Sequence, residues 1–233
     1  MAKTAQQSGQ LVIRDCGLAE YGQILSVQQE LLAARQEDSV PNTILVVEHH
    51  PVITLGARKS ENKLRADDAA LRAKGIEIVS IGRGGGTTAH NPGQLVIYPI
   101  VKLKSLNIDV TEFVRRIEQV GLELLAQLDI TANRKKGLPG LWVGDEKIAS
   151  VGVQIKKWVT MHGIAINIQN DLSIFDWIVP CGLDGVTMTS AARLTGKQYN
   201  MNTIHQAAAQ LCRRLFSKEH ERHGTQTQTT RMA

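Results

Sequence analysis

Residues 141–168, LWVGDEKIASVGVQIKKWVTMHGIAINI, constrain the fold more than any other part of the chain. Apolar side chains stand at every second position from Ala149 to Ile155, which is the period of a strand with one buried face. Gly144-Asp145 stands where a two-residue hairpin turn would, and Lys156-Lys157 lies near a second turn. The stretch therefore predicts a three-stranded antiparallel meander.

The other periodic segments place helices between and after runs of strands. Strands are predicted at residues 43–50, 52–56, 76–81 and 95–101, and helices at residues 19–35, 110–128 and 202–216. Asp109 with Glu112 resembles a capping box at the start of the second helix. Pro99 indicates that its strand lies at a sheet edge or that the strand ends there. This order predicts an α+β fold with a mostly antiparallel or mixed sheet.

The chain has 233 residues, enough for one large domain or two small ones. Residues 11–216 contain no clear linker or repeat and are interpreted as a single domain, whereas residues 1–10 and 217–233 are polar and are expected to be disordered. No apolar run approaches the roughly 18 residues of a membrane span. Because the N-terminus also lacks the apolar stretch of a secretory signal, a cytoplasmic location is expected.

A net charge of +5 raises the question of nucleic acid. The basic residues are scattered, aromatic residues make up only 4% of the chain, and no RNA- or DNA-binding motif is present, so this class of partner is not expected. A mildly basic surface suits acidic protein partners, which it attracts over a distance. A solvated surface without a special purpose is the alternative interpretation.

The three cysteines stand in different contexts, and their odd number and wide spacing argue against a disulfide framework. Cys212 falls on the apolar face of the last predicted helix, where a core role is expected. Cys16 lies at a predicted strand-to-helix junction, and packing is again the expected role. Cys181 lies between Pro180 and Gly182, which disfavour regular structure, and loops of this kind often present reactive side chains. Cys181 is therefore a candidate nucleophile, with a purely structural loop cysteine as the alternative.

A nucleophilic cysteine needs a base, because the thiolate attacks and a free thiol titrates near ~8.5. The histidines outside the last helix and the tail are candidates, namely His49, His50, His90 and His162. Lys147 is a further candidate, because a regular strand would place it on the same apolar side as Ala149 to Ile155. A partly desolvated lysine there would be ready to exchange a proton with a thiol. Alternatively, Lys147 snorkels to solvent at the strand end.

Residues 82–94, GRGGGTTAHNPGQ, form a glycine-rich loop directly after a predicted strand. Neither a GxxxxGK[ST] nor a GxGxxG pattern fits, and no helical pattern follows at once, so a phosphate loop is not indicated. The glycines allow the backbone to approach a ligand closely, with a tight structural loop as the alternative. A metal site is not expected, because HExxH and CxxC patterns are absent and His49 and His50 are adjacent.

Four motifs occur in the order RGGGTTAHNPGQLVIYPI, GLPGLWVGDEKIASVGV, TMHGIAINI and IVPCG. Together they resemble the lipoyl(octanoyl) transferases, and VVEHHPVITLG and DLSIFDWIVP match segments of that family too. The resemblance runs from about residue 11 to residue 197. It implies the fold of biotin- and lipoate-protein ligases, a mixed β-sheet flanked by helices.

The resemblance also implies roles for individual residues. The family's acyl-thioester cysteine falls on Cys181, and the lysine that favours the thiolate of that cysteine falls on Lys147. Substrate contacts fall on three segments, made up of Arg83, Gly84, Gly85, Gly86, Thr87, Thr88, Ala89 and His90, then Ser150, Val151 and Gly152, then Gly163, Ile164 and Ala165. The implied reaction is an acyl transfer in two steps that needs no ATP, metal or other cofactor.

The same resemblance implies the partners. The donor would be octanoyl-acyl carrier protein, which presents the acyl group on phosphopantetheine. The acceptors would be lipoyl domains of 2-oxoacid dehydrogenase complexes and the glycine cleavage H protein. The enzyme itself is expected to be a monomer, with no nucleic-acid or membrane partner.

The chain departs from the family pattern in the glycine-rich loop. Ala89 replaces an aromatic residue before the loop histidine, and Asn91 replaces a glycine after it. Gly86-Thr87 replaces a commoner pair of a polar residue and valine. Loss of an aromatic side chain at Ala89 predicts a locally wider pocket, which leaves the selected acyl length open.

Three other functions are compatible with parts of the pattern. An ATP-dependent lipoate or biotin ligase on the same fold would form an adenylate and would not need Cys181. A thiol hydrolase would use Cys181 with His90 or His162 and pass the acyl group to water. A carrier-protein binding module would hold its partner without becoming acylated.

Overall fold

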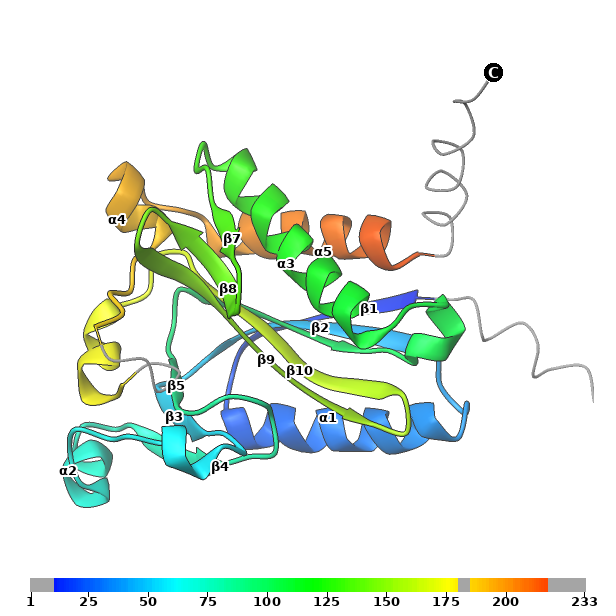
Figure 1. Cartoon of the computed structure of the whole chain (residues 1–233), viewed down its shortest axis with the longest axis horizontal. Helices are drawn as coiled ribbons and strands as arrows, with labels where there is room; N and C mark the ends of the chain where they lie inside the picture. Colours follow the sequence, from blue (N-terminus) through cyan, green and yellow to red (C-terminus); the bar gives the residue numbers. More distant parts are fainter. Residues whose placement is uncertain (1–10, 180–184, 218–233) are drawn as a thin grey trace, which may run out of the picture.

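The computed structural model describes residues 11–179 and 185–217. Its main sheet has seven strands in the order β1-β2-β6-β10-β9-β8-β7, in which only β1 and β2 are parallel neighbours (Figure 1). These strands are β1 (Leu11–Ala19), β2 (Asn42–His49), β6 (Gln94–Ile100), β7 (Asn133–Lys135), β8 (Leu138–Val143), β9 (Glu146–Lys156) and β10 (Val159–Asn167). The prediction of a mixed sheet in an α+β fold is confirmed.

Strands β8, β9 and β10 form the predicted antiparallel meander. The first turn is Gly144-Asp145, where Gly144 has a φ of 57°. The second turn is Lys157-Trp158, and both residues have positive φ, 48° and 65°. Two positive φ values match the right-handed twist of a two-residue hairpin, so the local turn geometry sets the register of β9 against β10.

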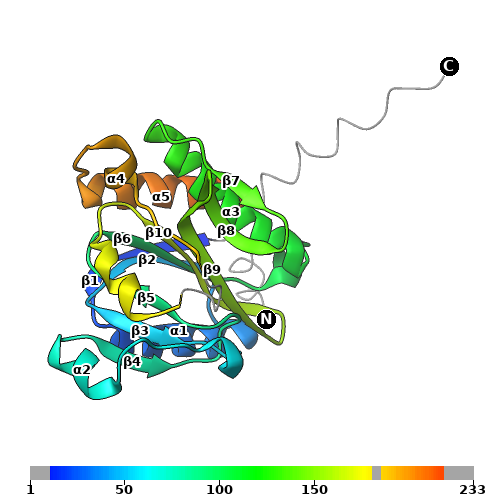
Figure 2. The same cartoon turned by 60° about the vertical axis from the view of Figure 1, so that its left-hand side comes forward.

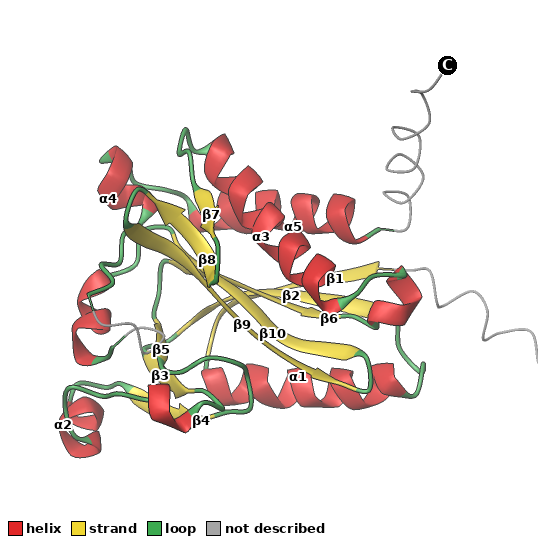
Figure 3. Cartoon of the chain, in the orientation of Figure 1, coloured by secondary structure: helices red, strands yellow, loops and turns green. Residues whose placement is uncertain are grey.

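Helices cover both faces of the main sheet (Figures 1 and 3). Helices α3 (Val110–Gln127) and α5 (Met201–Phe216) lie on one face, and α1 (Tyr21–Gln36) lies on the other. Phe113 of α3 packs edge-on against Phe216 of α5 with ring centroids 6.1 Å apart, a contact worth about 0.5–1.5 kcal/mol beyond area burial. All three helices confirm the predicted segments, and the side chain of Asp109 caps α3 by accepting from the Glu112 amide.

A second sheet of three strands lies beside α1, in the order β4-β3-β5 (Figure 2). Its strands are β3 (Val52–Leu55), β4 (Glu77–Ser80) and β5 (Thr88–His90), and the short helices α2 (Asp68–Ala73), α4 (Ala191–Thr195), η1 (Lys59–Glu61), η2 (Leu103–Leu106) and η3 (Leu172–Trp177) complete the fold. The sequence predicted β3 and β4, but it treated residues 82–94 as loop throughout. Pairing of β5 with β3 turns the end of this loop into a strand.

Strand β6 lies in the middle of the main sheet, between β2 and β10, so an edge position for Pro99 is wrong. The alternative, that the proline marks a strand end, is correct, because β6 ends at Ile100. The paired residues of β6 and β10 stop at Ile97 and Ile164. The proline therefore falls just beyond the ladder to β10, where its missing N–H is not required.

The ends predicted to be disordered are residues 1–10 and 217–233. All of these residues lie outside the described part of the chain except Ser217, which forms the C-cap of α5. Among the helices of the described chain, none is long and apolar enough to cross a membrane.

Candidate active site

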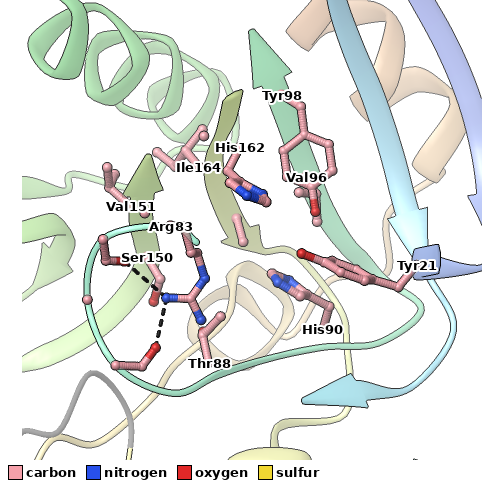
Figure 4. Close-up of a pocket in the computed structure, with 16 residues that line it drawn as sticks. Tyr21, Arg83, Thr88, His90, Val96, Tyr98, Ser150, Val151, His162 and Ile164 are labelled. Carbon is pink, nitrogen blue, oxygen red and sulfur yellow. Dashed lines mark hydrogen bonds between the residues drawn. The ribbon is translucent and has the colours of Figure 1, made fainter. Parts of the chain in front are cut away.

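A pocket with an empty volume of about 460 Å³, part of it open to solvent, lies where the two sheets and α1 meet. Its walls come from α1, β5, β6, β9, β10 and the glycine-rich loop (Figure 4). The lining residues are Tyr21, Arg83, Gly84, Gly85, Gly86, Thr88, His90, Val96, Tyr98, Ser150, Val151, Gly152, His162, Gly163, Ile164 and Ala165. The fold thus brings the three predicted contact segments together around one cavity.

Thr87 and Ala89 are the two predicted contact residues that do not line this pocket. Successive residues of a strand point to opposite faces, so Thr88 and His90 face the pocket while their neighbours face away. The Thr87 hydroxyl accepts from the Lys63 amide at 3.1 Å. Ala89 is fully buried in the cluster around β3, α2 and η3. The expectation that Ala89 widens the pocket is therefore wrong.

Asn91, the other departure from the family pattern, also lies away from the pocket. Its side-chain amide donates to the Asp171 carbonyl at 2.8 Å and accepts from Asn170 at 3.1 Å. Both bonds join the end of the glycine-rich stretch to the segment that precedes η3. Asn91 thus has a structural role in holding these two segments together.

Arg83 holds the glycine-rich loop from inside. Its Nη1 donates to the carbonyls of Gly86 at 2.8 Å and Gly84 at 3.2 Å (Figure 4). Its Nη2 donates to the carbonyl of Thr54 at 3.0 Å and to the hydroxyl of Thr54 at 2.7 Å. The residue is only 7% exposed. The planar, multi-donor guanidinium is suited to this task, because it joins the loop to β3 through several bonds at once.

The loop carbonyls point at donors within the protein. The Arg83 carbonyl accepts from the Ala57 amide at 2.9 Å, and the Gly85 carbonyl accepts from the Arg58 amide at 3.3 Å. The amides of Gly85 and Gly86 have no acceptor within residues 11–179 and 185–217, although both residues line the pocket. Gly85 has a φ of 82°, which favours glycine. The loop therefore offers two consecutive N–H donors to a ligand.

An aromatic cluster occupies the end of the pocket away from the loop. Tyr21 stacks on His90 with centroids 6.0 Å apart and planes at 10°, and it lies 5.0 Å from His49. Tyr98 packs between His49 and His162 at 5.8 and 6.2 Å. These rings come from α1, β2, β5, β6 and β10, so no local motif indicates that they meet.

Hydrogen bonds fix two of the histidines in this cluster. Nδ1 of His90 donates to Oε1 of Gln94 at 2.7 Å, because the amide of Gln94 already donates to the Ala89 carbonyl and to Asn167. Nδ1 of His49 donates to the Ala19 carbonyl at 3.2 Å, and its Nε2 accepts from the Tyr98 hydroxyl at 2.9 Å. Each ring is thereby held in one tautomer and one orientation.

Burial keeps the histidines of the cluster neutral. It lowers the pKa of His90 to about 3 and the pKa of His49 to about 4, mainly because a charged imidazolium would lose its hydration. The pKa of His162 is lowered to about 4 by burial and, in second place, by the Arg83 charge. The far end of the pocket is consequently uncharged near neutral pH.

The sequence did not predict Tyr21, Val96 or Tyr98 as pocket residues, whereas it considered His162 as a possible base or as a residue that shapes the site. Tyr21 belongs to the buried face of α1 and is 2% exposed. Tyr98 is the one polar aromatic side chain in the strand QLVIYPI, and this was the only local signal.

A groove lies on the other side of the glycine-rich loop and contains Lys147. It shares Gly84, Gly85, Val151 and Gly152 with the pocket, so these four residues form the wall between the two spaces. The remaining lining residues are Arg58, Glu61, Val114, Gly137, Leu138, Pro139, Lys147 and Val153.

Lys147 is 2% exposed, so the lysine is desolvated as predicted and the snorkelling interpretation is wrong. The predicted reason is wrong, because Lys147 pairs with Trp142 and Ala149 with the adjacent Leu141, a register shift that breaks the regular alternation of β9. Its Nζ lies 5.3 Å from the centroid of the Trp142 ring, a cation–π contact. A side chain at Gly140 would place its Cβ 2.9 Å from Cε of Lys147, and Gly140 has a φ of 118°. The glycine therefore provides the room that the lysine stem occupies.

Cys181 lies outside the described residues, but the segments on both sides of it are described. Before it, the Val179 amide donates to the Lys63 carbonyl at 3.1 Å. After it, the Lys147 amide donates to the Thr187 carbonyl at 2.8 Å, and the Thr189 amide donates to the Lys147 carbonyl at 2.9 Å. The chain that follows Cys181 is thus paired with β9 at Lys147 itself.

The other two cysteines have the expected structural positions. Cys212 is fully buried among α5, α3 and the main sheet, and burial raises the pKa of its thiol to about 12. Cys16 lies in β1 and packs partly buried against the α1 cluster, which likewise raises its pKa, chiefly through burial. Within residues 11–179 and 185–217, no group of three or more histidine, cysteine, aspartate or glutamate side chains could hold a metal ion.

A mixed sheet with helices on both faces and a glycine-rich loop over a pocket are the features to compare with known proteins. The lipoyl protein ligase A/B catalytic domain matches residues 20–213. LipL1 of P. falciparum, solved with lipoate, has a TM-score of 0.69 at 14% identity over 89% of this chain and 62% of that one. The bipartite lipoate protein ligase of Thermoplasma acidophilum has a TM-score of 0.67 at 15% identity, over 89% of this chain and 83% of that one.

Two curated relatives narrow the class. The octanoyltransferase of Syntrophobacter fumaroxidans is 40% identical over 87% of this chain and 89% of the relative. The octanoyltransferase of Solibacter usitatus is 42% identical over 77% of this chain and 82% of the relative. The chain therefore belongs to the lipoyl(octanoyl) transferase family within the lipoyl protein ligase A/B class.

Proposed function

We propose that this protein transfers an octanoyl group from octanoyl-acyl carrier protein to a lysine of lipoyl domains, through a thioester on Cys181. The observation that carries the proposal is the position of Lys147, buried in a groove that shares a wall with the pocket. The names of the curated relatives support octanoyl transfer. The acceptors would be 2-oxoacid dehydrogenase lipoyl domains and the glycine cleavage H protein.

The first step moves the acyl group to the enzyme. Lys147 takes the proton of the Cys181 thiol, and the thiolate attacks the carbonyl carbon of the donor thioester. The tetrahedral intermediate collapses with cleavage of the bond to the phosphopantetheine sulfur, and the Lys147 ammonium returns its proton to that leaving thiolate. One thioester replaces another, so the step needs no ATP.

The second step moves the acyl group to the acceptor. The neutral amine of the acceptor lysine attacks the Cys181 thioester, and Lys147 takes the proton that the new amide nitrogen must lose. The carbon–sulfur bond breaks, the Cys181 thiolate leaves, and the Lys147 ammonium returns the proton to it, which regenerates the starting thiol and amine. Burial of Lys147 supports this role, because it holds the amine out of bulk water in a groove that shares a wall with the pocket.

Each tetrahedral intermediate carries an oxyanion that needs fixed donors. The consecutive amides of Gly85 and Gly86 are candidates, because both line the pocket and neither donates to a described residue. The loop is already held by Arg83, so these donors would need little reorganisation during the reaction. Loss of one oxyanion donor typically costs on the order of 10²–10³ in rate.

The lining of the pocket suits a saturated acyl chain. Val96, Ile164 and Ala165 supply apolar surface, and the histidines at the far end are neutral. Each methylene that leaves water contributes about 0.8 kcal/mol to binding. The pocket would therefore hold the acyl group while the carbonyl reacts beside the loop.

The test is the intact mass of the purified protein after incubation with octanoyl-acyl carrier protein without ATP. We expect one octanoyl adduct on the wild type, none on Cys181→Ala, and slow formation on Lys147→Ala. Addition of a lipoyl domain should discharge the adduct and acylate the domain. Cys16→Ala is the matched control, because it removes a thiol that packs in β1 and should still acylate.

Three outcomes would contradict the proposal. Transfer that requires ATP and proceeds in Cys181→Ala would indicate a ligase. Release of free octanoate without a lipoyl domain would indicate a thiol hydrolase. Stable binding of the carrier protein without any adduct would indicate a binding module.

A further inference from the structure

The pocket has a reactive end and a closed end. Gly84, Gly85, Val151 and Gly152 separate it from the groove of Lys147, so chemistry on a bound acyl group takes place at that wall. An acyl chain whose carbonyl lies there must extend toward the aromatic cluster. This orientation rests on the function proposed above, because it assigns the reacting carbonyl to the side of Lys147.

Tyr21 stands at the closed end. It is the first residue of α1 and enters the pocket from the opposite side to the glycine-rich loop (Figure 4). Its ring stacks on His90, and its hydroxyl points into the cavity toward His90 and His162 (Figure 4). No residue in the described chain forms a hydrogen bond with that hydroxyl. The ring is therefore part of the wall that the end of a longer acyl chain would meet.

The residues behind Tyr21 cannot easily move aside. His90 is held by Gln94, which is held in turn by Asn167 at 2.8 Å. His49, 5.0 Å from the Tyr21 ring, is held by the Ala19 carbonyl and the Tyr98 hydroxyl. Displacing either histidine would leave buried polar atoms without partners, which costs free energy for each broken bond. The closed end is consequently a rigid wall.

We infer that the Tyr21 ring, backed by His90 and His49, sets the maximum length of the acyl chain that the enzyme accepts. Ala89, the position at which the sequence suggested a change in acyl selectivity, faces away from the pocket. Val96, Ile164 and Ala165 lie on strands along the sides of the pocket, so they contact the chain without blocking its end. Selectivity for length thus depends on a helix residue far from the reacting groups.

The experiment compares octanoyl-, decanoyl- and dodecanoyl-pantetheine as donors for the wild type and Tyr21→Ala. Each further methylene that can be buried improves binding about fourfold. We expect the ratio of kcat/KM for the dodecanoyl over the octanoyl donor to rise 10- to 100-fold in Tyr21→Ala. Tyr21→Phe keeps the ring and should change the ratio less than threefold. Because both donors are measured on the same enzyme preparation, this ratio of kcat/KM values does not depend on the fraction of enzyme that is folded.

Ile24→Ala is the matched control, because Ile24 is buried in the same helix but does not line the pocket. It should leave the ratio unchanged even if it destabilises the protein. An unchanged ratio in Tyr21→Ala, or an equal rise in Ile24→Ala, would overturn the inference.

Calorimetric binding of octanoate and dodecanoate tests the same wall without catalysis. Tyr21→Ala should gain affinity for dodecanoate relative to octanoate by a factor similar to that in the kinetic ratio. If the wild type transfers no acyl group but this shift occurs, the proposed function fails and the length determinant is retained. If transfer occurs and neither ratio shifts, the length determinant fails alone.

Discussion

The two spaces on either side of the glycine-rich loop differ in charge. The inner pocket ends in His90, His162 and Tyr21, whose pKa values are shifted by burial so that all three are neutral near pH 7. The outer groove contains ionisable side chains, among them Lys147 and the ion pair of Arg58 with Glu61 at 2.9 Å. Both spaces share a wall of glycine and valine backbone.

This difference indicates that the pocket and the groove have separate roles, one in binding the acyl chain and the other in proton exchange. The far end of the pocket should bind an apolar chain about equally well at any pH well above 4, because His90 and His162 stay neutral there. Under the proposed function, Lys147 in the groove supplies the proton exchange that acyl transfer requires. Substitutions in the groove should therefore change rate, and substitutions in the pocket should change selectivity.

The largest effect is expected from Lys147→Met, which keeps the apolar stem and removes the amine. Without a group to exchange protons, the rate of transfer should fall about 10²–10⁴-fold. Octanoate affinity, measured by calorimetry, should change less than about threefold, because the pocket is intact. Lys156→Met, on the exposed end of the same strand, is the control. A parallel loss of rate and affinity would show that the two spaces are not independent.

A smaller effect is expected from Arg83→Lys. One ammonium cannot reach Thr54 and the carbonyls of Gly84 and Gly86 together, so buried acceptors lose their donors. The free energy of unfolding should fall by about 2–4 kcal/mol, measured by urea denaturation. Arg58→Lys, at an exposed ion pair in the groove, should cost less than about 1 kcal/mol. An equal loss of free energy of unfolding in both variants would mean that Arg83 does not support the glycine-rich loop between the pocket and the groove.

The neutral histidines predict a pH dependence of stability. The pKa in the folded protein is about 3 for His90 and about 4 for His162, below the ordinary value of 6.5. At pH values between the folded and the ordinary pKa, the unfolded chain therefore binds more protons than the folded protein. Their contribution is fully present above pH 6.5 and is lost as the pH falls toward 4. Each histidine contributes a slope of at most about 1.4 kcal/mol per pH unit.

His162→Asn is the variant that tests this pH dependence. His162 has a φ of 61°, and asparagine tolerates that conformation. Urea denaturation between pH 4 and pH 8 should give a shallower slope for this variant below about pH 6.5. An unchanged slope would argue that His162 is not held neutral in the folded state.

The smallest effect on activity is expected from a Cys16→Ala/Cys212→Ala double variant. Both thiols have raised pKa values and pack in apolar surroundings, Cys212 with a pKa of about 12. Transfer should stay within about twofold of the wild type. In the native protein, iodoacetamide should not modify Cys212. A large loss of transfer would mean that one of these two thiols, and not Cys181 alone, takes part in the reaction.

Local periodicity predicted the long elements well. The helices α1, α3 and α5 and the meander of β8 to β10 follow from apolar side chains at regular spacing, and such spacing is a property of one continuous segment. The short elements β5, α2 and α4 were not predicted, because three to six residues carry too little periodicity. The central position of β6 was not predicted either, because strand order depends on contacts between distant segments.

The sequence by itself determined the class of elements and, through its ordered motifs, the family. Only the tertiary structure decided that Tyr21, His49, His90, Tyr98 and His162 form one cluster, and that Ala89 faces away from the pocket. The physical reason is that a repeating pattern records which side of an element is buried. What that side is buried against depends on elements from elsewhere in the chain, which meet only when both sheets and the helices have packed.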